Sequence, residues 1–257
     1  GDVAQVRKEL DAVVQAGHEK VVDVLLRAGA DPDLAADSQF TPLMIAAQNG
    51  HLDVVRRLLE GNADVRVAQE DGWNAMFSAS TKEHLDIVRV LAKAGASVDP
   101  VKEGFTPLTY AAQDGNLKAV ALLLELGADA DAKVAKADGP SPVYMASQND
   151  HDDVLAALLE AGADPNGRAD QQEAPLVIAA AKGHRAIVAR LLRAKVDPNT
   201  ASADGDLALT WAAYNGDAEL VRLLLDAGAD PELKDGDGRT AKDWAEEQDH
   251  PDVAALL

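Results

Sequence analysis

The sequence predicts an all-α fold in which short helix-turn-helix units stack side by side and hairpin-like loops join them. Three short sequence markers recur along the 257 residues at a spacing close to 33. Because the markers keep a fixed phase relative to one another, they indicate one structural unit that is repeated along the chain. We therefore expect a solenoid in which each unit contacts mainly its two neighbours.

The first marker is a triplet similar to Thr-Pro-Leu that begins a helix. Its middle residues are spaced 33, 32, 35, 33, 33 and 33 apart, and they are Pro42, Ala75, Pro107, Pro142, Pro175, Ala208 and Ala241. A Thr or Ser before this residue caps free N–H groups at the helix start, and proline is tolerated in the first turn. Pairs of alanines follow in several units and allow neighbouring helices to approach closely.

The second and third markers delimit a second helix in each unit. One is a glycine followed by His, Asn or Asp, as in Gly50-His51, Gly115-Asn116, Gly183-His184 and Gly216-Asp217. The residues after it are apolar at helical spacing, which predicts an amphipathic helix. The other is a closing Gly-Ala-Asp, whose glycine provides the left-handed conformation at the helix end.

These markers resemble the ankyrin repeat family, whose signature of about 33 residues contains Thr-Pro-Leu-His-x-Ala. The resemblance covers the whole chain as a single domain of about eight units, at residues 1–35, 36–68, 69–101, 102–135, 136–168, 169–201, 202–234 and 235–257. It implies a curved solenoid whose first helices and hairpins line a concave groove. The family's histidine after Leu is absent, so its hydrogen bonds cannot be transferred. The residues in its place are Met44, Phe77, Thr109, Tyr144, Val177, Thr210 and Asp243.

Two internal positions depart from the repeat. The spacing of 35 before Pro142 predicts two extra residues near positions 134–138, either drift in an exposed loop or a contact for a partner. Lys195 stands at a helix end where other units have glycine or Asn62. A left-handed lysine costs about 1 kcal/mol, so this helix end is a candidate weak point.

The two ends of the chain also differ from the inner units. Residues 3–16 form either one long capping helix or the remains of a unit with a segment missing between Ala12 and Val13. The last unit is more polar, which is typical of the outer cap of a solenoid.

Composition limits the partners. The chain has 44 acidic and 24 basic residues and a formal charge of −20. Nucleic acids and anionic membranes, which are bound through Lys and Arg, are therefore excluded as expected partners, and proteins with basic patches are favoured.

Cysteine is absent, and no apolar run approaches the roughly 18–20 residues that span a bilayer. We expect a cytoplasmic monomer.

Catalytic and metal-binding patterns are lacking. Each histidine stands at the second marker, where other units have Asn116 or Asp217, which predicts helix N-caps and not metal ligands. These residues are His18, His51, His84, His151, His184 and His250. Asp235 and Asp237 lie in a turn-like segment without the ligand spacing of a calcium loop. No phosphate-binding loop or nucleophile motif occurs, so we expect no enzyme activity, no cofactor and no metal.

The candidate binding residues are those that vary while the repeat stays fixed. Three aromatic residues precede the first marker: Phe40, Trp73 and Phe105. A second set ends the first helices: Gln48, Asn49, Thr81, Lys82, Gln113, Asp114, Tyr214 and Asn215. In ankyrin domains both sets face the groove, where the three rings would form a ladder that either anchors a partner or packs along the hairpins. Acidic residues that would charge the same surface are Glu70, Asp71, Glu103, Asp114, Asp170, Glu173, Asp204 and Asp206.

The sequence therefore predicts a non-catalytic module that binds a protein or peptide with basic and apolar residues, mainly through units two to four. The alternative is an architectural spacer within a longer multidomain protein, without a ligand of its own.

Overall fold

The computed structural model describes residues 3–35, 39–131, 139–167 and 174–257, with side chains from residue 8 onward. Within these ranges every regular element is a helix, and two isolated β-bridges, Ala68 with Asn74 and Lys102 with Phe105, are the other backbone pairings. The chain divides into two compact parts, called unit 1 and unit 2 from here on, and each contains several of the 33-residue repeats. Unit 1 comprises residues 1–111 and 121–129, and unit 2 comprises residues 112–120 and 130–257.

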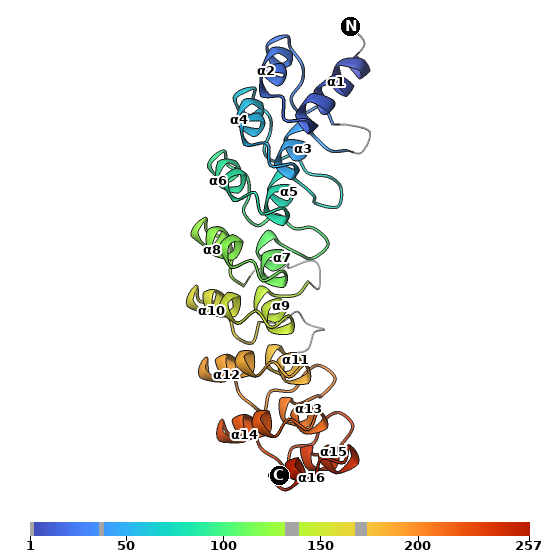
Figure 1. The fold of residues 1–257 in the computed structure, drawn as a ribbon, viewed down its shortest axis with the longest axis vertical. Helices are drawn as coiled ribbons and strands as arrows, with labels where there is room; N and C mark the ends of the chain where they lie inside the picture. The colour runs from blue at the N-terminus through green and yellow to red at the C-terminus, as the bar shows by residue number, and fades with distance from the viewer. Residues whose placement is uncertain (1–2, 36–38, 132–138, 168–173) are drawn as a thin grey trace. The chain divides into compact units, whose positions relative to one another are not determined.

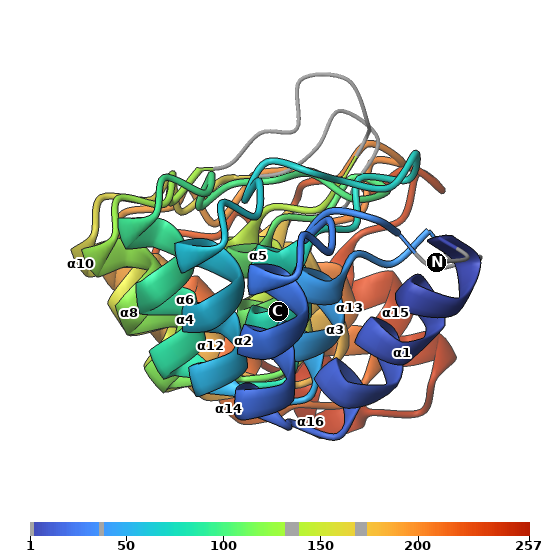
Figure 2. The ribbon, with the colours of Figure 1, turned by 90° about the horizontal axis from the view of Figure 1, so that it is seen from above.

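Unit 1 is a stack of helix pairs. Its helices are α1 (Val3–Gln15), α2 (Glu19–Arg27), α3 (Pro42–Gln48), α4 (Leu52–Glu60), α5 (Ala75–Thr81) and α6 (Leu85–Lys93), and it shares α7 (Pro107–Gln113) and α8 (Leu117–Glu125) with unit 2. Helices α1, α3 and α5 pack in one row, and α2, α4 and α6 lie in a second row (Figure 1). The loops that join one pair to the next lie on one side of both rows (Figure 2).

Unit 2 repeats the same arrangement. Its helices are α9 (Pro142–Gln148), α10 (Asp152–Glu160), α11 (Pro175–Ala181), α12 (Arg185–Arg193), α13 (Ala208–Tyr214), α14 (Ala218–Asp226), α15 (Ala241–Glu247) and α16 (Pro251–Ala254). The odd-numbered helices pack against one another in sequence order, and each also packs against the helix that follows it (Figure 1).

In the inner pairs the first helix is buried nearly all round, whereas the second buries one face. In α5 six of seven residues are buried, including the fully buried Phe77. In α6 three of nine residues are buried: Ile87, Val88 and Leu91. The small side chains of the first helices therefore let them sit in the middle of the stack, as the alanine pairs predict.

The predicted helix starts are confirmed where a capping side chain is present. The Thr41 hydroxyl accepts a hydrogen bond from the Met44 N–H at 3.3 Å, and the Ser141 hydroxyl accepts one from the Tyr144 N–H at 3.0 Å. Asn74 caps α5 in the same way. Each bond satisfies an N–H group that has no partner within the helix.

Most of the positions that depart from the repeat in the sequence lie within the described residues. Residues 3–15 form one helix, so the first of the two N-terminal alternatives is confirmed. Lys195 has φ 66° and Asn62 has φ 67°, which confirms the left-handed lysine. The last helix pair is polar as predicted, because α15 buries only Ala241 and Ala245. Positions 134–138, together with Asp170 and Glu173, lie outside the described residues.

The histidines are structural, but the prediction that their side chains cap the second helices is wrong. None of the six makes a capping hydrogen bond. Five place Nε2 at 2.9–3.2 Å from a main-chain oxygen of the preceding repeat, namely His51 with Gln15, His84 with Gln48, His151 with Gln113, His184 with Gln148 and His250 with Tyr214. Since a carbonyl only accepts, Nε2 carries the proton in each.

A glycine in the preceding repeat makes room for most of these rings. A Cβ atom on Gly50, for example, would lie 2.6 Å from Cε1 of His84. The histidines therefore join adjacent repeats, a role that no local sequence pattern indicates. Only Asp217 and Asn116, which occupy the same position, cap their helices.

Candidate protein-binding surface

The predicted residues at the first-helix ends lie at the last turns and C-caps of α3, α5, α7 and α13. The exposed ones are Asn49, Lys82, Asp114, Tyr214 and Asn215, and the half-buried ones are Gln48, Thr81 and Gln113. The Asn49 Nδ2 group donates to the Ile45 carbonyl at 2.9 Å, and the Asn215 Nδ2 group donates to the Ala181 carbonyl at 2.9 Å. These amides are thereby held in place with their oxygens free to accept from a ligand.

Trp73 and Phe105 belong to one aromatic cluster of unit 1, joined through two further rings. Trp73 stacks on Phe77 at 5.9 Å, Phe77 meets the edge of Tyr110 at 5.8 Å, and Tyr110 contacts Phe105 at 4.9 Å. The Trp73 indole also donates to the Ser78 hydroxyl at 2.8 Å. These two rings thus take part in packing, while both remain half-exposed.

Phe40, the third predicted ring, is half-buried and makes no ring contact within the described part of the chain. The structure therefore brings two of the three predicted rings together and leaves the third apart. Partner binding by Phe40, Trp73 and Phe105 stays a prediction.

The aromatic cluster of unit 1 contains its own cation. The Lys102 Nζ lies 5.6 Å from the Trp73 ring centroid, 3.3 Å from the Asp71 carboxylate and 3.2 Å from the Glu103 carboxylate. Its side chain is only 14% exposed. Burial alone lowers the pKa of Lys102, but the hydrogen bonds to Glu103 and Asp71 outweigh it and raise that pKa. The ammonium is thus held charged against the indole.

A second aromatic cluster lies in unit 2. Trp211 and Tyr214 meet edge to face at 5.6 Å, and Tyr214 and Trp244 meet edge to face at 5.4 Å. The guanidinium carbon of Arg239 lies 4.3 Å from the Trp244 ring centroid. Three large rings on neighbouring first helices therefore form one continuous surface with an exposed Tyr214.

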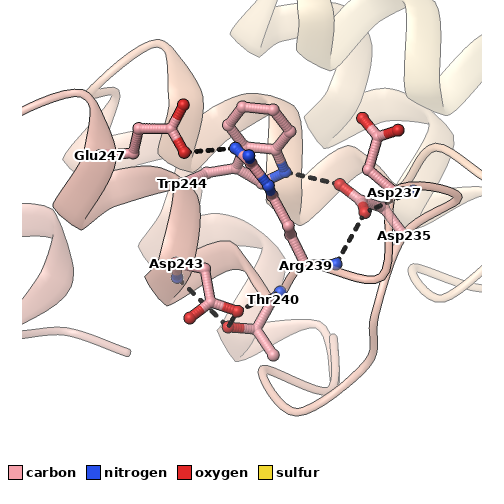
Figure 3. Close-up of polar contacts among 7 residues, drawn as sticks. All are labelled: Asp235, Asp237, Arg239, Thr240, Asp243, Trp244 and Glu247. Carbon is pink, nitrogen blue, oxygen red and sulfur yellow. Dashed lines mark hydrogen bonds and ion pairs between the residues drawn. The ribbon is translucent and has the colours of Figure 1, made fainter.

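The hairpin at residues 235–239 fixes the position of Trp244 (Figure 3). One oxygen of the buried Asp235 carboxylate accepts from the N–H groups of Asp237 and Arg239, each at 3.0 Å. Its other oxygen accepts from the Trp244 indole N–H at 2.5 Å. Arg239 in turn pairs with Glu247. Asp235 therefore orders both the loop and the ring.

A capping box at the start of α15 holds the same helix. The Thr240 hydroxyl accepts from the Asp243 N–H at 3.2 Å, and the Asp243 carboxylate accepts from the Thr240 N–H at 2.8 Å (Figure 3). The backbone hydrogen bond from Thr240 lowers the pKa of Asp243. The carboxylate thus stays charged beside the helix N-terminus.

A pocket of about 250 Å³ opens between these rings and the hairpins of unit 2. It is lined by Asp206, Thr210, Trp211, Tyr214, Asp235, Asp237 and Trp244. Burial raises the pKa of Asp206, and the nearby carboxylates of Asp235, Asp204 and Asp237 raise it further, whereas the Trp211 indole acts in the opposite direction. The pocket therefore combines aromatic walls with negative charge.

The family follows from comparison with known proteins. A model of the family described as ankyrin repeats (3 copies) matches residues 10–102, 97–169 and 176–257. The chain belongs to the ankyrin repeat family. Its fold is similar to the crystal structure of the human ASB11 ankyrin repeat domain, with a TM-score of 0.73, 26% identity, and coverage of 84% of this chain and 97% of that one. No curated protein matches the chain.

Membership confirms the predicted fold class, an all-α ankyrin-repeat fold of helix-turn-helix pairs. Ankyrin repeats are generally modules for protein–protein interaction and generally non-catalytic. In the described ranges, no three His, Asp or Glu side chains come together where they could hold a metal ion. No helix in those ranges is both long and apolar enough to cross a membrane.

Four rings of the aromatic clusters were not predicted from the sequence: Phe77, Tyr110, Trp211 and Trp244. A signal for three of them exists in the ankyrin repeat itself. Tyr110, Trp211 and Trp244 each occupy the fourth residue of a first helix. Comparing this position between repeats shows the aromatic residues directly, whereas the position before the first marker shows only Phe40, Trp73 and Phe105.

Proposed function

We propose that the chain is a non-catalytic interaction module that binds a protein or peptide with basic and apolar residues through its first helices and hairpin tips. The observation that carries this proposal is that aromatic rings and carboxylates occur together on this surface in each unit. In unit 1 they are Trp73 and Phe105 with Asp71 and Glu103. In unit 2 they surround the pocket.

The chemistry of this surface favours a basic ligand. Half-exposed rings offer apolar area and attract cations, and nearby carboxylates accept from Lys or Arg. The charge of −20 extends the attraction beyond the contact itself and speeds association. Because exposed charges are screened, we expect binding to weaken as salt rises.

The residues proposed to contact the partner are those predicted from the sequence. They are Phe40, Gln48, Asn49, Trp73, Thr81, Lys82, Phe105, Gln113, Asp114, Tyr214 and Asn215. Their exposed members present two amides, one carboxylate, one ammonium group and a phenol at helix ends, and such polar groups can bind an extended peptide without rearrangement of the helices.

A peptide library displayed on phage and selected against the chain tests the proposal. We expect the recovered peptides to combine Lys or Arg with apolar residues. Their affinity should fall on the order of tenfold in Asp114→Lys, which reverses an exposed charge on the proposed surface. The matched control is Asp226→Lys, which makes the same change on the exposed face of α14. An equal loss in both variants, or no enriched peptides, would favour the spacer role instead.

A further inference from the structure

The two aromatic clusters differ at several repeat positions, and one of these holds the internal cation of unit 1. Lys102, the internal cation of unit 1, stands five residues before Pro107, which begins α7. Five residues before Ala241, which begins α15, stands Gly236. The position that gives unit 1 its ammonium group therefore has no side chain beside the pocket of unit 2.

Packing of the hairpins excludes a side chain at this position. A Cβ atom on Gly236 would lie 2.0 Å from the main-chain oxygen of Asp204, far closer than atoms can approach. The Gly236 N–H donates to the Gly205 carbonyl at 3.1 Å, which holds the two hairpins together. The chain therefore cannot fill this pocket with a lysine of its own at position 236.

The residues that line the pocket leave its negative charge without a cation. They include Asp206, Asp235 and Asp237 but no Lys or Arg. The Arg239 guanidinium lies over Trp244 and pairs with Glu247. Asp235 is already used by three N–H donors, so Asp206 and Asp237 are the carboxylates that remain for a ligand.

One carboxylate in the wall points to the same conclusion. The Trp211 indole stands beside the Asp206 carboxylate. Burial and the carboxylates of Asp235, Asp204 and Asp237 raise the pKa of Asp206, and the indole lowers it too little to compensate. The ionised Asp206 therefore lacks a balancing positive charge in this pocket, and an ammonium group would provide it.

We propose that this pocket binds the side chain of a lysine supplied by the partner. Its ammonium donates to Asp206 and Asp237, and its methylenes lie against Trp211, Tyr214 and Trp244. This inference rests on the proposed function, since it names one contact that a basic partner makes.

The geometry favours lysine over arginine. Asp206 and Asp237 come from two different hairpins, and a compact ammonium with three donors can serve two separate carboxylates. A planar guanidinium instead suits a single carboxylate that accepts two parallel bonds. Unit 1 shows the same preference internally, because Lys102 lies between Asp71 and Glu103, which also come from successive hairpins.

The three tryptophans make the test direct, because each gives one indole N–H signal in a nitrogen–proton NMR spectrum. The full chain is titrated with N-acetyl-lysine methylamide, and Trp73→Phe assigns the remaining signals to the pocket. We expect the Trp211 and Trp244 signals to shift and the Trp73 signal to stay, since Lys102 already occupies that site. The norleucine analogue, which lacks the ammonium, should leave all three unchanged. Equal shifts with lysine and norleucine would overturn the proposal, and so would tighter binding of the arginine analogue.

Two variants examine the carboxylate. Asp206→Asn should weaken the lysine probe on the order of tenfold, because a charge-assisted hydrogen bond is lost. Asp226→Asn removes the same charge from α14 and should leave the affinity within twofold. If both variants weaken binding equally, the attraction is general and the pocket is not the site. A preserved helical circular dichroism spectrum shows that each variant is folded.

The outcome is separable from that of the proposed function. Shifts with the lysine probe but no peptides selected from the library would support the pocket and contradict the peptide-binding role. Selected peptides whose binding does not depend on Asp206 would support the role and contradict the pocket.

Discussion

The aromatic clusters of the two units both combine rings with carboxylates, but they differ in whether the chain supplies a cation to balance the negative charge. In unit 1, Lys102 lies over Trp73 and between two carboxylates, so charge and ring are satisfied within the chain. In unit 2, Gly236 occupies the equivalent position and a pocket lined by rings and carboxylates is left open. The comparison sets a cation that the chain supplies itself against a pocket for which we propose a cation supplied by the partner.

Packing density separates the two clusters as well. The central ring of the unit 1 cluster is Phe77, which is fully buried between Trp73 and Tyr110. The central ring of the unit 2 cluster is Tyr214, which lies between Trp211 and Trp244 and is 39% exposed. We therefore expect substitutions in unit 1 to affect stability most and those in unit 2 to affect binding most.

The largest expected effect is that of Phe77→Ala. Removing a fully buried ring leaves a cavity and should lower the free energy of unfolding of unit 1 by about 3–5 kcal/mol. Hydrogen exchange in urea, resolved for α5 and α6, measures it. Tyr214→Ala is the comparison in unit 2 and should cost less than half as much. Equal losses would show that the two clusters are packed alike.

Lys102→Ala should have the next largest effect. It removes a cation–π contact and two ion pairs with partly exposed carboxylates, which together contribute about 1 kcal/mol. The melting temperature of the variant should recover in part on addition of butylammonium chloride, whereas sodium chloride at the same ionic strength should not restore it. Lys118→Ala, an exposed lysine on α8, serves as control. Absence of recovery would mean that the site collapses without its lysine.

The ion pairs between second helices should differ less between the two units in the stability that they contribute. Arg190 makes two hydrogen bonds of 2.6 Å to the Asp152 carboxylate, with side chains 32% and 38% exposed. Arg89 pairs with Glu125 at 52% and 60% exposure. Arg190→Met should therefore cost up to about 1 kcal/mol, and Arg89→Met should cost less because solvent screens the more exposed pair. Urea unfolding at low and high salt compares them.

The pH dependence of the Arg190 pair has a definite sign. The hydrogen bond from Arg190 lowers the pKa of Asp152 below its ordinary value of 3.8. The stabilisation is therefore complete above that value and is lost as pH falls through the lower pKa of the folded state. The gap in stability between the parent chain and Arg190→Met should close in this acidic range, and a gap that stays constant would exclude the pair as its cause.

Asp206→Asn should have a small effect on stability, and its sign is the opposite of the others. Burial raises the pKa of Asp206 in the folded chain, so the ionised carboxylate opposes folding at neutral pH. The variant should be more stable than the parent by about 0.5 kcal/mol at pH 7. This gain should vanish as pH falls through the raised pKa, where the parent binds its proton. Urea titrations between pH 7 and 3 measure it, and a loss of stability at pH 7 would contradict the open pocket.

Much of the fold could be predicted because its signals are local. The caps at Thr41 and Ser141 join residues three positions apart, and the left-handed Lys195 follows from its place at a helix end. The histidines show the limit. Their repeat position is plain, but their hydrogen bonds reach back 36 to 38 residues to the preceding repeat, and only packed repeats bring those atoms together.

The candidate site also contains residues that could be predicted from their repeat position and contacts that could not. Trp73 and Phe105 could be singled out by position, yet the rings that connect them, Phe77 and Tyr110, stand on two different first helices. In the same way, Gly236 suggests a turn in the sequence, and the close approach of Asp204 that requires it belongs to the neighbouring hairpin.

The sequence by itself determined the repeat, the order of the helices, the Thr and Ser caps of the first helices and the acidic charge, because these depend on residues within one turn or on composition alone. The tertiary structure decided which rings touch, which repeat each histidine binds and where a lysine is enclosed or excluded. Those outcomes depend on distances of a few ångströms between successive repeats, and such distances are set by the packing of side chains from both.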